Sequence, residues 1–138
     1  DVQEYLSLSQ TERDAIVKAR IGQGQFRESL ISYWGMCAVT GCQEYALLKA
    51  SHIKPWSMSA VTERLSLYNG LLLSPTLDAC FDSGFISFND SGSIMVSNEL
   101  NSQDMIALGL HDNMRLSRVE SEHRKYLAYH RKNIFRRI

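Results

Sequence analysis

A short apolar run with polar residues at both ends constrains the fold of this chain more than any other feature. The run spans Leu71–Leu73, follows the dipeptide Asn69-Gly70 and precedes Ser74-Pro75. Asn-Gly is typical of a turn, serine is a preferred N-cap, and proline is favoured at the first helical position. The sequence therefore predicts a buried strand that is followed at once by a helix, and Gly84 is the expected end of that helix.

A second predicted strand precedes this unit. Residues 47–53 are bounded by Pro55, and a polar loop over residues 56–69 leads to the apolar run. The segment 47–83 is thus expected to form a strand, a loop, a strand and a helix. Its joints carry three polar residues: His52 ends the first strand, Asn69 opens the second, and Asp78 lies on the first turn of the helix.

Helices and one hairpin are expected on either side of this unit. The segment Ser9–Glu12 has the pattern of a capping box, so a helix should begin at Gln10. The glycines at positions 22 and 24 predict a break after Arg20, because glycine disfavours a helix interior. The other expected elements are a helix over 25–34 that ends at Gly35, a hairpin with strands at 85–88 and 93–97, and helices at 102–108 and 119–135.

Length and composition indicate one ordinary globular domain. The chain has 138 residues and a formal net charge of zero, so it lacks the overall basic charge of many nucleic-acid-binding proteins. Its last sixteen residues nevertheless hold six lysines and arginines and no acid. A neutral total can therefore conceal a basic face.

The cysteine count bears on the compartment. There are three cysteines, an odd number, and no recognisable secretion signal, which favours free thiols in a reducing compartment. We therefore expect a cytoplasmic protein, and no apolar run is long enough for a membrane span. Since the chain begins at Asp1 rather than Met, we also expect it to be the C-terminal part of a longer protein.

Four ordered segments carry a resemblance to a known family. They read CAVTG at Cys37–Gly41, SHIKPW at Ser51–Trp56, NGLLLSP at Asn69–Pro75 and LDACFD at Leu77–Asp82. In this order they resemble the HNH, or ββα-metal, endonucleases, especially the branch found in bacterial restriction and defence proteins. The resemblance implies an α+β fold: a ββα-metal core at about 47–83, flanking helices and an additional hairpin, in one domain over residues 1–138.

The resemblance also implies a function. It points to a metal-dependent DNA endonuclease that hydrolyses phosphodiester bonds, as the cleavage module of a restriction or anti-phage protein. His52 is expected to be the general base, because imidazole titrates near neutral pH. Asn69 is expected to hold the loop that carries His52. Asp78 is expected to face His52 across a cleft and to bind Mg²⁺ or Mn²⁺, since hard ions prefer carboxylates.

The sequence departs from the family pattern at the metal site. Many members carry a metal-binding Asp or His at the position of Ser51, and serine is a poor ligand. The usual final histidine is Asp78 here. Asp82 lies one helical turn later on the same face and is a candidate second ligand, although a solvated surface carboxylate is an equal alternative.

Candidate DNA contacts are drawn from the basic residues. Lys54 and Arg64 lie near the proposed base in sequence, although Arg64 could instead pair with Glu63 or Asp82. The last predicted helix supplies Arg124, Lys125, Arg131 and Lys132, for which a solvated helix face is the alternative. A domain of this kind is expected to need a homodimer or an N-terminal recognition domain for double-strand cutting.

Two other functions stay open from the sequence. One is a catalytically inactive DNA-binding module, because Ser51 removes a usual ligand. The other is a zinc-stabilised interaction domain, but the second cysteine pair of such domains would fall near Ser74 and Leu77, so structural zinc is not expected.

Overall fold

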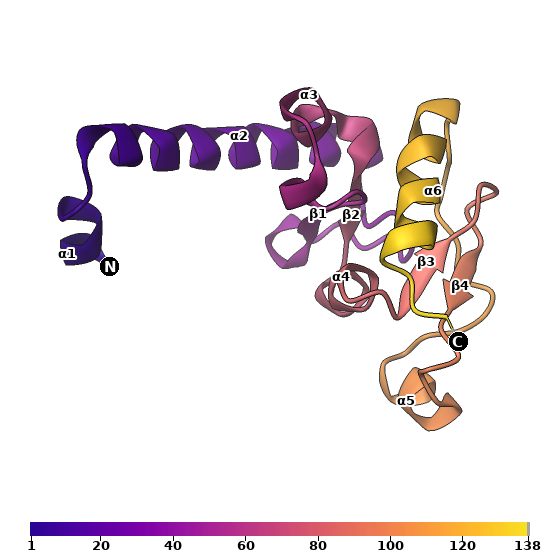
Figure 1. Ribbon diagram of the computed structural model, residues 1–138. Helices are drawn as coiled ribbons and strands as arrows, with labels where there is room; N and C mark the ends of the chain where they lie inside the picture. Colours follow the sequence, from indigo (N-terminus) through magenta and orange to yellow (C-terminus); the bar gives the residue numbers. More distant parts are fainter. Residues whose placement is uncertain (138) are drawn as a thin grey trace.

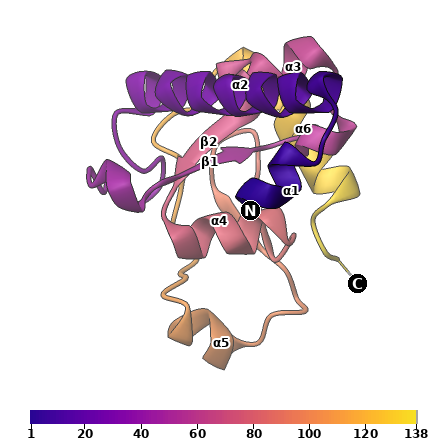
Figure 2. The same ribbon diagram turned by 90° about the vertical axis from the view of Figure 1, so that its left-hand side faces the viewer.

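The centre of the molecule is a two-stranded antiparallel hairpin between two helices. The computed structural model describes residues 1–137 and pairs β1 (Lys49–His52) with β2 (Gly70–Leu73), with His52 opposite Gly70. Helix α2 (Gln10–Trp34) covers one face of the hairpin and α4 (Pro75–Asp82) covers the other (Figures 1 and 2). The α+β architecture and the predicted order of strand, loop, strand and helix are confirmed.

The segment between the two strands is more ordered than predicted. Residues 56–69 were expected to form a polar loop, but they contain the short helix α3 (Val61–Leu65) and 3₁₀ turns at Trp56–Met58 and Leu67–Asn69. Another 3₁₀ turn, Tyr45–Leu47, replaces the expected start of β1. Backbone hydrogen bonds within these turns satisfy polar groups that an open loop would leave to water.

Helix α2 corrects the predicted break at Gly22 and Gly24. It runs for 25 residues without interruption, from the capping box of Ser9 and Glu12 to Gly35, whose φ of 72° ends it. Two glycines disfavour a helix by about 2 kcal/mol in total. Burial of Phe26, Leu30 and Trp34 against the hairpin and the caps at both ends outweigh this cost.

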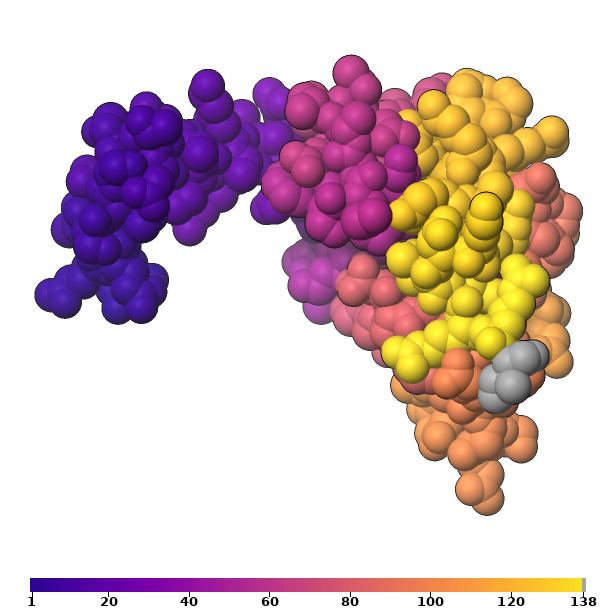
Figure 3. Space-filling model, in the orientation of Figure 1, coloured from indigo at the N-terminus to yellow at the C-terminus, as the bar shows by residue number. Residues whose placement is uncertain are grey.

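The N-terminal half of α2 extends away from the rest of the molecule. Its residues are mostly exposed, and α1 (Val2–Leu6) turns back from its start (Figures 1 and 3). The sequence did not predict α1. None of the helices within residues 1–137 has the length and apolar character needed to cross a membrane.

Gly70 allows α2 to approach the hairpin closely. A Cβ atom at this position would lie 2.5 Å from Cζ of Phe26 and 2.7 Å from Cδ2 of Leu30. Its φ of −149° is ordinary extended backbone, so the turn expected at Asn69-Gly70 ends at Asn69, the last residue of the 3₁₀ turn Leu67–Asn69. Glycine is needed here for space rather than for a special backbone conformation.

A second hairpin and the C-terminal helix complete the fold. Strands β3 (Ile86–Phe88) and β4 (Ile94–Val96) pair as predicted, and α5 (Ser102–Ala107) follows. The last helix, α6 (Arg124–Asn133), packs on β3 and is shorter than the predicted 119–135. Its start is displaced because Glu120 is extended and donates its backbone N–H to Nδ1 of the buried His123, ahead of a 3₁₀ turn at Ser121–His123.

Candidate active site

His52 is held in one orientation at the end of β1. Its Nε2 lies 2.8 Å from the backbone oxygen of Arg64, and its ring stacks on Phe26 with the ring centres 3.9 Å apart. A carbonyl oxygen only accepts hydrogen bonds, so Nε2 carries the ring proton and donates it. Nδ1 is then the basic atom, and it has no hydrogen-bond partner among residues 1–137.

The same surroundings keep His52 neutral. Burial lowers the pKa of this imidazole, the Arg64 carbonyl raises it, and the charge of the Arg64 side chain lowers it again. The net shift is downward. An imidazole that is neutral at neutral pH can accept a proton from water.

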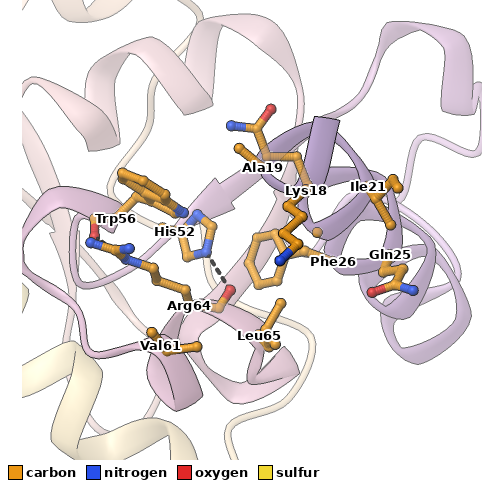
Figure 4. A pocket seen from close by; sticks show the side chains of 12 residues that line it. Lys18, Ala19, Ile21, Gln25, Phe26, His52, Trp56, Val61, Arg64 and Leu65 are labelled. Carbon is orange, nitrogen blue, oxygen red and sulfur yellow. Dashed lines mark hydrogen bonds between the residues drawn. The ribbon is translucent and has the colours of Figure 1, made fainter. Parts of the chain in front are cut away.

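His52 lines a cavity of about 380 Å³ between α2 and the segment that contains α3 (Figure 4). Trp56, Arg64 and Leu65 lie on one side, and Lys18 and Gln25 of α2 lie on the other. Because the sequence predicted a break in α2 at Gly22 and Gly24, it did not indicate that this helix lines the cavity. The signal that could have revealed it is the helical spacing of Phe26, Leu30 and Trp34.

Asn69 ties down the segment that follows His52. It is fully buried, and its Oδ1 accepts the backbone N–H of Lys54 at 2.8 Å. Its Nδ2 donates to the Glu63 carbonyl oxygen at 3.1 Å and to Oγ of Ser59 at 3.3 Å. The expected contact between Asn69 and the loop that carries His52 is present, and it extends to both ends of that loop.

Asp78 lies on the other face of the hairpin. Successive residues of a strand point to opposite faces, so Ser51 points toward α4 while His52 points toward α2. Burial raises the pKa of Asp78, and a hydrogen bond with Ser51 opposes this shift. The negative charge of Asp82 raises the pKa further and the positive charge of Lys49 lowers it, so that the net shift is upward. Asp82 is exposed one turn further along α4.

The structure does not place His52 and Asp78 across a common cleft, as the sequence had led us to expect. Asp78 lines neither of the two cavities that His52 lines. The reason is the alternation within β1: the residue next to His52, Ser51, is the one that meets Asp78.

The donors on the α4 face suit a hard divalent ion. Asp78 and Asp82 supply carboxylates and Ser51 a hydroxyl, and Mg²⁺ typically binds one or two carboxylates and keeps several waters. Within residues 1–137, no three His, Cys, Asp or Glu side chains come together as a metal cluster. An ion held by Asp78, Asp82 and Ser51 would complete its shell with water or substrate oxygens.

Two candidate DNA contacts near His52 already have protein partners. The Nζ atom of Lys54 lies 3.0 Å from a carboxylate oxygen of Glu63. Arg64 does not take either of its predicted ion-pair partners within residues 1–137. Its guanidinium lies 3.6 Å from the ring centre of Trp56 and donates to that residue's carbonyl oxygen.

The basic residues of α6 divide into two groups. Arg131 donates to the Phe88 carbonyl oxygen and pairs with Asp90 at 3.0 Å, so it supports the second hairpin. The exposed members are Arg124, Lys125 and Lys132.

Comparison with known proteins identifies the central segment. The HNH endonuclease family model matches residues 37–89, from the turn at Cys37 through both strands and α4 to the end of β3. Over this segment the chain is therefore similar to HNH endonuclease domains. No curated protein matches the chain. The HNH match covers the ββα unit, whereas the α2 wall of the His52 cavity lies outside it.

Proposed function

We propose that this HNH domain is a metal-dependent endonuclease that hydrolyses phosphodiester bonds in DNA. The observation that carries the proposal is the state of His52: Nε2 donates to a backbone carbonyl oxygen, and Nδ1, which borders a cavity, has no partner in the part of the chain that the structure describes. This is the arrangement that a general base requires, since one nitrogen fixes the tautomer and the other accepts the proton.

In the proposed reaction, Nδ1 of His52 takes a proton from water as the water oxygen attacks phosphorus. The bond from phosphorus to the 3′ oxygen breaks, and that oxygen takes a proton from a second water molecule, which leaves a 5′-phosphate and a 3′-hydroxyl. The Arg64 carbonyl oxygen stabilises the imidazolium that forms, because its hydrogen bond from Nε2 becomes charge-assisted. Asn69 is a positioning residue, since it holds the segment between His52 and Arg64.

Asp78, Asp82 and Ser51 are the proposed holders of Mg²⁺ or Mn²⁺. Such an ion, when bound, stabilises negative charge on the leaving 3′ oxygen. Because His52 and Asp78 lie on opposite faces of β1, we place the scissile phosphate at the edge of β1 away from β2, which no other strand of residues 1–137 covers. Groups from both faces can reach a substrate at that edge.

The biological role that we propose is the cutting module of a restriction or anti-phage protein in the cytoplasm. The order of the four sequence motifs supports this assignment. Arg124, Lys125 and Lys132, exposed on α6, are the proposed contacts to the DNA backbone, with Arg64 nearer the cut site. A recognition domain that precedes this chain, or a homodimer, would supply sequence selection and double-strand cutting.

A plasmid-nicking assay tests the catalytic proposal. Supercoiled plasmid should be nicked with Mg²⁺ or Mn²⁺ and left intact with chelator. His52→Ala should slow nicking by about 10²- to 10⁴-fold, the usual contribution of a general base. His111→Ala is the matched control, because His111 is exposed and outside the cavity. If His52→Ala nicked at the wild-type rate, the base would be another group. DNA binding without cleavage would support an inactive binding module instead.

Titration of Mn²⁺ by calorimetry tests the ligands separately. Asp78→Ala should weaken Mn²⁺ binding and abolish nicking, whereas Asp78→Asn should retain part of both because an amide oxygen still coordinates hard ions. Asp104→Ala is the control, since Asp104 also lies in the first turn of a helix, α5. Unchanged Mn²⁺ affinity in Asp78→Ala would show that the ion binds elsewhere.

A further inference from the structure

The cavity beside His52 has two chemically different walls. On one wall the Arg64 guanidinium lies against the ring of Trp56, a residue that is 44% exposed. On the other wall α2 presents Lys18 and Gln25, and Leu65 and Phe26 add apolar surface between them (Figure 4). A volume of about 380 Å³ is in the range of small-ligand sites.

The lining indicates the kind of ligand. The residues around the cavity include two cations, Lys18 and Arg64, and no carboxylate. Apolar and aromatic surface suits a flat ring, amide side chains can hydrogen-bond to its edge, and the cations suit a nearby phosphate. A nucleotide has the flat ring, the hydrogen-bonding edge and the phosphate that this lining suits. A purely apolar ligand would leave the cations and amides unused, and a cationic ligand would be repelled by Lys18 and Arg64.

We propose that this cavity binds one unpaired base of the substrate strand, next to the phosphate that is cut. The proposal rests on the nuclease function above and adds a substrate class to it. A base inside a duplex is stacked and paired, so it must be displaced before it can enter a protein cavity. The preferred substrate is therefore single-stranded DNA or DNA with a locally unpaired nucleotide.

The glycines of α2 offer a matched pair of variants. A Cβ at Gly22 would point toward Leu65, 3.7 Å from its Cδ2, and Gly22 lines the cavity. A Cβ at Gly24 would meet nothing within 4 Å, and Gly24 is not part of the lining. Gly22→Leu and Gly24→Leu both replace a glycine in the same helix, but only the first fills the cavity.

The experiment compares two fluorescently labelled probes in the presence of chelator: oligothymidylate, and an abasic backbone of equal length and charge. Fluorescence anisotropy should show that the wild type binds oligothymidylate roughly tenfold more tightly, the contribution of one stacked base. Gly22→Leu and Trp56→Ala should bind the two probes almost equally. Gly24→Leu should keep the wild-type preference.

Two results would overturn the base site. One is equal binding of both probes by the wild type, and the other is an unchanged preference in Gly22→Leu. Failure of this proposal is distinguishable from failure of the nuclease. Plasmid nicking without base preference refutes only the base site, whereas base preference without nicking refutes the nuclease function and leaves a base-binding module.

Discussion

Two histidines of this molecule have nearly the same immediate surroundings and differ in one hydrogen bond. His52 stacks on Phe26 and His130 stacks on Phe81, with ring centres 3.9 and 3.8 Å apart. In both, Nε2 lies 2.8 Å from a backbone carbonyl oxygen, that of Arg64 or of Phe81. At His130, however, Nδ1 lies 2.8 Å from Oγ of Ser87 and the residue is 1% exposed.

The same stacked and hydrogen-bonded histidine occurs here once as a structural link and once as the proposed general base. In His130 both nitrogens are satisfied, and the ring links α6 to β3 and to the end of α4. In His52 the second nitrogen has no partner among residues 1–137 and borders a cavity. What makes a histidine a candidate base in this fold is therefore the free Nδ1, since the aromatic stack and the carbonyl contact are common to both.

The largest effect on stability is expected at His130. His130→Ala removes a buried ring and leaves the Ser87 hydroxyl and the Phe81 carbonyl without their partner. We expect a loss of about 3 kcal/mol in the free energy of unfolding. Urea denaturation measures it, and His111→Ala, at an exposed position, should change it by less than about 0.5 kcal/mol. A stable His130→Ala protein would show that this ring is not a link between the elements.

A pH series sharpens the same comparison. Burial lowers the pKa of His130 from 6.5 to about 4, so the folded protein resists protonation of this ring. Its contribution to stability is complete above pH 6.5 and is lost as the pH falls toward 4. A shift of this size corresponds to about 3 kcal/mol. The difference in unfolding free energy between wild type and His130→Ala should therefore shrink with acidification, and a constant difference would contradict the assignment.

An intermediate effect is expected at Gly70, which lies opposite His52. Gly70→Ala forces Phe26 and Leu30 away from the hairpin, because the new Cβ would lie within 3 Å of both. We expect a loss of about 1–3 kcal/mol in stability and slower nicking, since Phe26 also supports the His52 ring. Gly24→Ala, in open space on α2, should instead stabilise by about 0.5–1 kcal/mol. Equal effects of the two variants in urea denaturation would refute the close approach at Gly70.

The sequence predicted those features that depend on neighbouring residues. The capping box at Ser9, the end of α2 at Gly35, the strand at Leu71–Leu73 and the helix start at Pro75 all follow from local chemistry and are confirmed. The continuity of α2 could not be predicted in this way. It depends on packing against a hairpin that lies far along the chain.

The sequence predicted which residues belong to the candidate site, but it predicted their relative positions only in part. Asn69 contacts the loop as expected, because the motif fixes its place immediately before β2. The separation of His52 from Asp78 was missed, although the sequence contained the signal: Ser51 and His52 are adjacent in a strand and must point to opposite faces. The cavity depends on α2 and on the turns after β1, which only the folded structure brings together.

The smallest effect we predict concerns the titration of His52 itself. Because burial lowers its pKa, kcat/KM for nicking should rise with pH, reach half its plateau below pH 6.5 and then level off. Arg64→Met removes a positive charge that also lowers this pKa but keeps the backbone carbonyl that binds Nε2. Its midpoint should lie slightly above that of the wild type, even if the plateau falls through weaker DNA binding. Lys132→Met, which removes an exposed charge from α6, should lower the plateau without moving the midpoint. A wild-type midpoint above 6.5 would mean that the base titrating in the reaction is not the half-buried His52.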